Sequence, residues 1–145
     1  KLSPSFASTV SKALQELDDR HSGQWDVLHL GARLLRPVQR EEKRDSALLC
    51  IPNFSLVCVG YILSVRGALK LMETLSNAYA TSLDDFKFTA GLIPVDGMLG
   101  TLQSAANSGG HPVAWVNGAY PPGTLAAWVC RPMVVRERDA LSSTD

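Results

Sequence analysis

The chain has 145 residues, of which 46% are hydrophobic and 19% are charged, so it is long enough for one domain with a single core. Lys plus Arg and Asp plus Glu each number 14, and this balance argues against a nucleic-acid partner, which requires a basic excess. No uncharged apolar run approaches the ~18 residues of a transmembrane helix, and no apolar secretory segment follows Lys1. We expect a soluble α/β domain, or part of one, without a transmembrane segment.

The first part of the chain predicts a helix, a strand and a long loop. Apolar residues recur at helical spacing over residues 6–17, Ser3 and Pro4 favour a cap before them, and a charged run followed by glycine over 18–23 ends the helix. The apolar run 25–31, which ends in glycine, is typical of a buried strand. Residues 32–53 carry both signs of charge and two prolines, so we interpret them as a surface loop, either functional or disordered.

A second strand and helix follow. The run 56–63 is the clearest strand of the chain, and Ser64 is a good N-cap for a helix that ends near Asn77. Residues 78–92 are predicted to be irregular. The apolar stripe expected to face the core consists of Val65, Ala68, Leu69, Met72 and Leu75.

The last part predicts a short helix and two short strands. Pro94 suits the first turn of a helix that the run Ser108-Gly109-Gly110 ends. The apolar runs 113–116 and 125–130 are separated by a turn at 121–123. The residues of the helix expected to face inward are Val95, Met98, Leu99 and Leu102. Helices alternating with strands in this order indicate a sheet with helices packed on it.

The acidic pairs and the cysteines do not have the spacing of a known metal-binding motif. The acidic pairs Asp18-Asp19 and Glu41-Glu42 are interpreted as solvated surface. Asp84-Asp85 is better placed for a metal, with a turn as the alternative, but none of the three pairs follows an apolar strand. The three cysteines share no CxxC spacing, which argues against a zinc site and leaves the redox compartment open. Those at 58 and 130 lie in apolar runs and are interpreted as buried hydrophobes. No metal site is therefore predicted in this chain.

The histidines do not form a short metal motif either. His29 lies within the first expected strand, and we interpret it as a hydrogen-bonded structural residue. His111 follows two glycines in a loop, where it is either a ligand or base or an ordinary surface histidine.

Asp96 has apolar neighbours on both sides and stands at the start of an expected helix. One interpretation is a carboxylate that complements the helix dipole. The other is a base or metal ligand that points into a cleft at a strand-to-helix junction.

Several stretches together resemble glycosyltransferase family 25, which includes bacterial lipooligosaccharide sugar transferases and animal procollagen galactosyltransferases. Residues 24–31 (QWDVLHLG) resemble the family's WDilyLG strand, and residues 54–71 resemble its GxxAYliSrrGAqkLl block. Residues 93–96 (IPVD) look like its lPvDefl motif, and 131–135 with 141–143 resemble the rPlvvq…fSsi ending. The order and approximate spacing match across most of the chain.

This resemblance implies a GT-A-type, Rossmann-related mixed sheet with flanking helices. It also implies transfer of a sugar, commonly galactose, from a nucleotide-sugar donor such as UDP-galactose to a glycan or protein acceptor. Inverting transfer of this kind uses a carboxylate base and a divalent metal such as manganese. Asp96 matches the family's acidic position and would be base or metal ligand. Tyr61 ends a strand, where α/β sheets contact ligands, although a core tyrosine is the alternative.

The sequence also departs from the family pattern. The acidic motif that holds the metal is expected just before the helix near Ser3 and has no counterpart, and Gly97 replaces the acid that usually follows Asp96. We therefore expect residues 1–145 to be a single domain, the C-terminal portion of a glycosyltransferase domain without its nucleotide-binding half. Such a chain would be inactive alone and would bind no metal strongly. The alternatives are a non-catalytic binding domain derived from a glycosyltransferase, and an unrelated α/β domain. The compartment stays open between the cytoplasmic face of a bacterial membrane and the endoplasmic reticulum lumen of an animal cell.

Overall fold

The fold is a mixed α/β arrangement with helices on both faces of one sheet. The computed structural model describes residues 3–33, 43–52, 57–85, 95–103 and 118–135. The helices and strands described there are α1 (Phe6–His21), β1 (Val27–Arg33), β2 (Lys43–Arg44), β3 (Leu49–Ile51), β4 (Val57–Leu63), α2 (Val65–Asp85), α3 (Val95–Gln103) and β5 (Ala127–Cys130).

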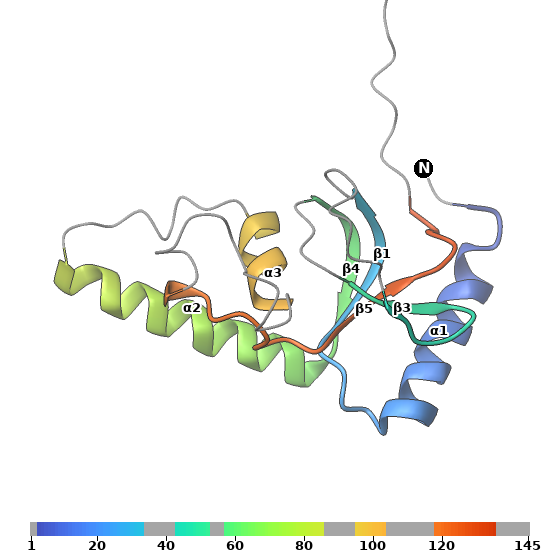
Figure 1. The fold of residues 1–145 in the computed structure, drawn as a ribbon, viewed down its shortest axis with the longest axis horizontal. Helices are drawn as coiled ribbons and strands as arrows, with labels where there is room; N and C mark the ends of the chain where they lie inside the picture. Colours follow the sequence, from blue (N-terminus) through green and yellow to red (C-terminus); the bar gives the residue numbers. More distant parts are fainter. Residues whose placement is uncertain (1–2, 34–42, 53–56, 86–94, 104–117, 136–145) are drawn as a thin grey trace, which may run out of the picture.

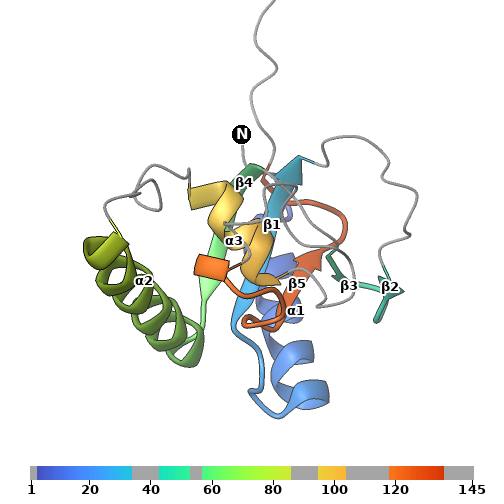
Figure 2. The ribbon, with the colours of Figure 1, turned by 60° about the vertical axis from the view of Figure 1, so that its left-hand side comes forward.

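The strands form one sheet in the order β2-β3-β5-β1-β4. The central strand β1 runs parallel to β5 and antiparallel to β4, and β3 runs antiparallel to both β5 and β2. Helix α1 lies on one side of this sheet, and α2 and α3 lie on the other (Figures 1 and 2). The expected α/β class with flanking helices is therefore confirmed.

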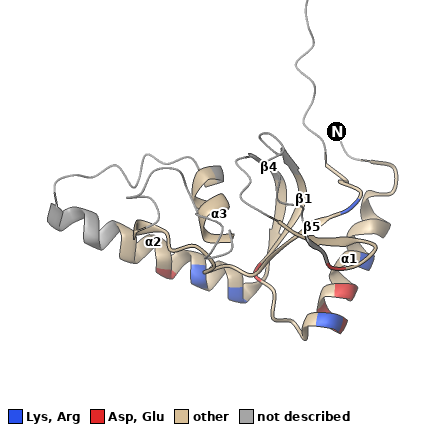
Figure 3. Ribbon diagram, in the orientation of Figure 1, with Lys and Arg blue, Asp and Glu red and all other residues tan. Residues whose placement is uncertain are grey.

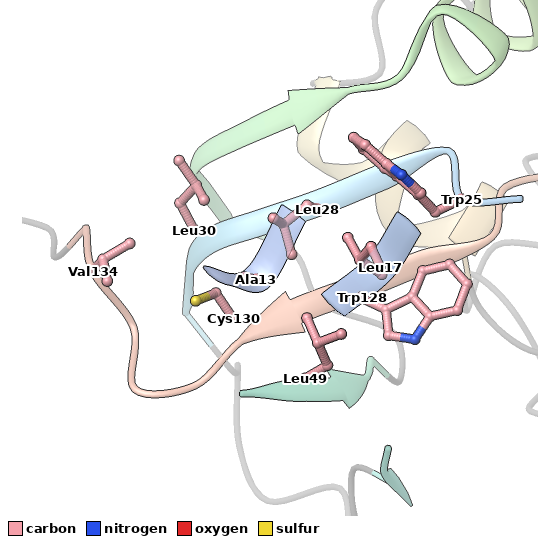
Figure 4. Close-up of a cluster of buried hydrophobic side chains, with 9 residues drawn as sticks. All are labelled: Ala13, Leu17, Trp25, Leu28, Leu30, Leu49, Trp128, Cys130 and Val134. Atoms are coloured by element: carbon pink, nitrogen blue, oxygen red, sulfur yellow. The ribbon is translucent and has the colours of Figure 1, made fainter. Parts of the chain in front are cut away.

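Alternation along the strands gives the sheet two apolar faces. On β1, Leu28 and Leu30 point to the α1 side, while Val27 belongs to the core under α2 and α3. On β5, Trp128 and Ala127 alternate in the same way. Figure 4 shows the α1-side cluster, which consists of Ala13, Leu17, Trp25, Leu28, Leu30, Leu49, Trp128, Cys130 and Val134.

The opposite core holds α2 and α3 against the sheet. Its α3 residues Met98, Leu99 and Leu102 are buried, as the sequence predicts, while Val95 is 48% exposed because it begins the helix. The buried members of this core are Val27, Ala78, Met98, Leu99, Leu102, Tyr120, Leu125 and Ala127.

The segment 32–53, predicted as a loop, contains the short strands β2 and β3. Leu49 and Cys50 pair with Cys130 and Val129 of β5, and Leu49 is fully buried. Pairing with a strand far along the chain is invisible to a local sequence pattern, so the prediction was wrong here for a tertiary reason.

The prediction for α2 was wrong in two respects. The helix continues to Asp85 rather than ending near Asn77, and the stripe expected in the core is largely exposed. The buried side of α2 is formed instead by Gly67 and Ala78, with Leu71 packed against the core. The helix is thus apolar on two sides, and periodicity alone selected the wrong one. The exposed fractions are 80% for Val65, 61% for Leu69, 65% for Met72 and 41% for Leu75.

The remaining elements agree with the sequence within a few residues. Helix α1 extends over the charged run to His21, and its cap residue is Ser5 rather than Ser3. The run 125–130 contains β5, whereas the expected strand at 113–116 lies outside the described residues. In the part of the chain that the structure describes, no helix has the length and apolar character needed to cross a membrane.

Alanine substitutions at Leu99, which is buried on α3, and at Leu69, which is exposed on α2, test the observed burial of these two helices. Leu99→Ala removes a fully buried side chain and should lower the free energy of unfolding by about 2–5 kcal/mol. Leu69→Ala removes a side chain that is 61% exposed and should change it by less than about 0.5 kcal/mol. Urea denaturation of both variants measures the difference, and equal losses would contradict the observed burial.

Candidate functional site

A buried carboxylate lies where three segments of the chain meet. Asp26, directly before β1, is fully buried. Its Oδ1 accepts a hydrogen bond of 2.7 Å from Nε of Arg66, and its Oδ2 accepts one of 2.8 Å from Nζ of Lys70. The backbone N–H of Ala126 donates to the same Oδ2 at 2.8 Å. We call Asp26, Arg66 and Lys70 the Asp26 cluster.

The start of α2 places both cations of this cluster. Ser64 caps the helix, since its Oγ accepts the backbone N–H of Gly67 at 2.9 Å. The same hydroxyl donates to the carbonyl of Trp25 at 2.6 Å, so the cap also fastens the helix to the strand. Arg66 and Lys70 are four residues apart and therefore lie on one side of the helix. Figure 3 shows the basic residues on the first turns of α2.

The remaining donors of the two cations bind backbone and amide oxygens. Arg66 Nη2 donates to the carbonyl of Gln24 at 3.1 Å, and its Nη1 donates to Oε1 of the same residue. Lys70 Nζ donates to the carbonyl of Thr124 at 3.1 Å. The cluster thereby ties the segment before β1, the start of α2 and the segment before β5 into one unit.

The hydrogen bonds decide the charge of this carboxyl group. Burial alone raises the pKa of Asp26, but the hydrogen bonds from Arg66, Lys70 and Ala126 outweigh it and hold the pKa below the ordinary value of 3.8. The hydrogen bond to Asp26 raises the pKa of the Arg66 guanidinium in turn. Asp26 is therefore ionised, and its ion pairs with Arg66 and Lys70 have a structural role.

Sequence reasoning did not single out Asp26 as a separate feature. Its signal is present, because a carboxylate stands at the start of an apolar strand and two basic residues follow a helix cap at a spacing of four. The sequence does not show that Asp26 contacts Arg66 and Lys70, which lie 40 and 44 residues further along the chain.

The predicted substrate-binding residue Tyr61 lies on β4 and is 38% exposed. It is paired in register with His29 of β1, and the two ring centroids are 6.4 Å apart. His29 is fully buried, and its Nε2 forms a hydrogen bond with Oε1 of Gln103, the last residue of α3. This confirms the interpretation of His29 as a hydrogen-bonded structural residue. Tyr61 consequently lies on the α3 side of the sheet and is accessible, not a core residue.

The predicted catalytic residue Asp96 is the second residue of α3. Its side chain lies outside the described part of the structure. The helix itself is firmly placed, since Met98 and Leu99 are buried and Thr101 Oγ1 donates to the carbonyl of Gly97 at 2.8 Å. The structure thus places Asp96 and Tyr61 on the same side of the sheet, and their roles stay predictions.

A second polar cluster ties the β2–β3 connection to the end of α1. Oδ2 of Asp45 lies 2.8 Å from Nε2 of His21 and accepts a hydrogen bond of 3.3 Å from Nε1 of Trp128. Arg20 Nη2 donates to the carbonyl of Asp45 at 2.9 Å. The rings of His21 and Trp128 are 4.5 Å apart. These contacts hold Leu49 and its strand against α1.

The other candidates from the sequence fall partly within and partly outside the described side chains. Asp18 and Asp19 are exposed on α1, as predicted, and Asp18 Oδ1 accepts a hydrogen bond of 3.1 Å from Trp25 Nε1. The pair at 84–85 ends α2 rather than forming a turn. Residues 41–42 and 111 lie outside the described residues. Among the residues with described side chains, no three His, Cys, Asp or Glu come together in a way that suits a metal ion.

The Asp26 carboxylate should contribute to stability above about pH 4. Asp26→Asn should lower the free energy of unfolding by roughly 2–4 kcal/mol at pH 7, less than for a wholly buried pair because both cations reach solvent. The pKa of Asp26 is lower in the folded state, so its stabilisation is present above the unfolded value of 3.8 and is lost as the pH falls through the folded value.

Urea denaturation between pH 3 and pH 7 should therefore show the gap between wild type and Asp26→Asn narrowing below about pH 4. Asp19→Asn, at an exposed carboxylate on α1, is the matched control and should change stability by less than about 0.5 kcal/mol. If the difference in stability between wild type and Asp26→Asn stays constant down to about pH 3, Asp26 is not ionised in the folded protein.

Gly67 should resist substitution although it lies in a helix. A Cβ at this position would stand 2.2 Å from the carbonyl oxygen of Asp26, whereas a Cβ at Gly118 would meet nothing within 4 Å. Helix propensity predicts that Gly67→Ala stabilises by about 1 kcal/mol, but we expect it to destabilise by about 1–3 kcal/mol because the strand must move. Thermal unfolding shows whether Gly67→Ala raises or lowers the stability, with Gly118→Ala as the control.

Comparison with known proteins supports the family resemblance. The chain is 26% identical over 136 residues to a protein of Aedes aegypti named glycosyltransferase 25 family member, and 25% identical over 135 residues to one of the same name from Drosophila melanogaster. Each alignment covers 93% of this chain and 19% of the relative, so the chain spans about a fifth of the length of these curated relatives.

No family model matches the sequence, and no solved structure matches the fold. The two relatives nevertheless share one family name, and each matches the chain over 93% of its length. The chain is therefore related to glycosyltransferase 25 family proteins, as its motifs indicate.

Proposed function

We propose that residues 1–145 are the C-terminal portion of a glycosyltransferase domain. In its complete form this domain would transfer a sugar from a nucleotide-sugar donor to a glycan or protein acceptor. The observation that carries the proposal is the similarity to two glycosyltransferase 25 family members over 93% of the chain. Galactose and a UDP-linked donor are the specific expectation that follows from the family resemblance.

The arrangement of the motifs supports the relationship. Two of the stretches that resemble the family, 24–31 and 54–71, supply every member of the Asp26 cluster. These motif residues hold the sheet and α2 together. Asp26, Arg66 and Lys70 thus belong to the framework of the domain. We propose a GT-A-like fold for its complete form.

The proposed reaction is an inverting displacement at the anomeric carbon of the donor. A hydroxyl of the acceptor attacks this carbon, the bond from the carbon to the diphosphate oxygen breaks, and the nucleoside diphosphate leaves with the bonding electrons. The carboxylate of Asp96 takes the proton of the attacking hydroxyl. Tyr61, accessible on the same side of the sheet as α3, would contact a substrate.

The described residues do not supply a site for the manganese ion that the family implies. Among them no three metal-ligating side chains gather, and the buried carboxylate of Asp26 is saturated by Arg66, Lys70 and Ala126. A buried acid paired with two cations is a poor ligand for a third. No step of the proposed reaction is therefore assigned to a metal held by these residues.

One observation favours the second candidate function, a non-catalytic binding domain derived from a glycosyltransferase. Gly97 stands where the family pattern has an acid, and it is buried within α3. Loss of that acid would remove part of the chemistry while the framework remains. The two functions differ in whether sugar is transferred, which is measurable.

Asp96→Asn tests the proposed base in the longer protein that contains these residues. With UDP-galactose, manganese and a glycan or protein acceptor, the variant should lose at least ~100-fold in kcat, because general-base catalysis contributes about 10²–10⁴-fold. Its unfolding temperature should stay that of the wild type. Asp19→Asn, exposed on α1, is the matched control and should transfer sugar normally.

Wild-type activity in Asp96→Asn would remove this residue from the mechanism. Absence of transfer by the wild-type longer protein with every donor tried would favour the binding domain. Residues 1–145 alone should transfer no galactose, and transfer by them would contradict the assignment as a portion of the active domain.

A further inference from the structure

A buried histidine supports the accessible tyrosine of β4. His29 is fully buried and stands directly opposite Tyr61 in the ladder of β1 and β4. Their ring centroids are 6.4 Å apart and the ring planes are inclined by 60°, which is within the range of a tilted aromatic contact. Leu63, the next residue of β4 on the same face, already packs against the core under α2 and α3. Tyr61 therefore lies at the margin of that core, backed by the imidazole.

Helix α3 fixes the orientation of the imidazole. Nε2 of His29 forms a hydrogen bond with Oε1 of Gln103, which ends α3 and is itself buried. A buried polar ring is costly unless it is hydrogen-bonded, so this bond favours one orientation of the His29 ring. Figure 2 shows α3 lying over this face of the sheet. The helix that carries Asp96 at its start thus sets, at its end, the ring that supports Tyr61.

The ladder of β1 and β4 becomes irregular directly beyond this pair. The register shifts between His29 and Gly31 and again between Gly31 and Ala32. Such bulges change the direction of side chains and occur frequently next to active sites. Packing fixes the irregular segment, because a Cβ at Gly31 would stand 2.2 Å from the carbonyl oxygen of Val135. His29 and Tyr61 are consequently held by the ladder, by the bulge and by α3.

We propose that His29 is a positioning residue, which holds the Tyr61 ring against the sugar of the nucleotide-sugar donor. This inference rests on the proposed function and names the part of the substrate that Tyr61 contacts. A tyrosine offers an apolar ring with a polar tip, and a hexose has C–H groups on its faces and hydroxyls around its rim. The proposed base Asp96 must act beside the anomeric carbon, and the helix that carries it also orients His29. These positions favour the sugar over the nucleotide as the group at Tyr61.

Calorimetric titration of the longer protein with UDP-galactose and with UDP, both in the presence of manganese, tests the proposal. His29→Asn removes the ring behind Tyr61 but keeps an amide that can bond to Gln103. The Kd of UDP-galactose should rise about 3–10-fold, the factor expected for loss of an aromatic contact, while that of UDP stays within about twofold. Leu28→Val is the matched control, since Leu28 is fully buried on the opposite face of β1, and both Kd values should stay within about twofold.

A double-mutant cycle shows whether His29 acts through Tyr61. Tyr61→Ala should weaken UDP-galactose binding at least as much as His29→Asn does, and adding His29→Asn to Tyr61→Ala should cause no further loss. Gln103→Met, which keeps the imidazole and removes its bond, should weaken UDP-galactose binding only while Tyr61 is present. It also serves as the test if His29→Asn does not fold.

Three outcomes would overturn the proposal. Losses that multiply in the double variant would mean that His29 does not act through Tyr61. Equal weakening of UDP and UDP-galactose would place the nucleotide, and not the sugar, at Tyr61. Unchanged UDP-galactose binding in His29→Asn and Gln103→Met would refute the inference alone, whereas a wild-type longer protein that binds neither ligand would contradict the proposed function as well.

Discussion

The fold depends on one buried carboxylate. Asp26 joins α2, through Arg66 and Lys70, to the start of β1, and it joins β1 to β5 through the backbone of Ala126. Charges are costly to bury unless they are paired and hydrogen-bonded, and each oxygen of this carboxylate is satisfied. The close approach at Gly67 brings the helix near enough for these bonds to form. Helix, central strand and parallel neighbour are thereby fixed together at one end of the sheet.

The candidate site lies on the α2 and α3 side of the same sheet. Helix α3 packs on the same side of the sheet as α2, and its Gln103 forms a hydrogen bond with His29 of β1. Tyr61 is accessible beside this contact, and Asp96 lies on the first turn of α3. The framework residues and the proposed reacting residues are thus different sets. Loss of chemistry and loss of fold should therefore be separable in this protein.

Local patterns predicted most elements but failed where distant segments decide the outcome. The helices at 6–21 and 95–103 and the strands at 27–33 and 57–63 follow from periodicity, caps and β-branched runs. The strand at 49–51 pairs with β5, which lies far along the chain, so the local sequence pattern does not predict it. For α2, two apolar sides compete, and contact with the sheet selects the side of Leu71 and Ala78. Asp26 was overlooked for the same reason, since its partners are 40 and 44 residues away.

The central claim is that this chain is the C-terminal portion of a larger glycosyltransferase domain. It is tested most directly by the intact mass of the protein as its own cells produce it, measured on material captured with an antibody against residues 1–145. The account predicts a polypeptide well above 15.7 kDa, with further strands and an acidic metal-binding motif in the additional sequence. A product of about 15.7 kDa would contradict it and would leave a binding domain that retains the Asp26 framework without the chemistry.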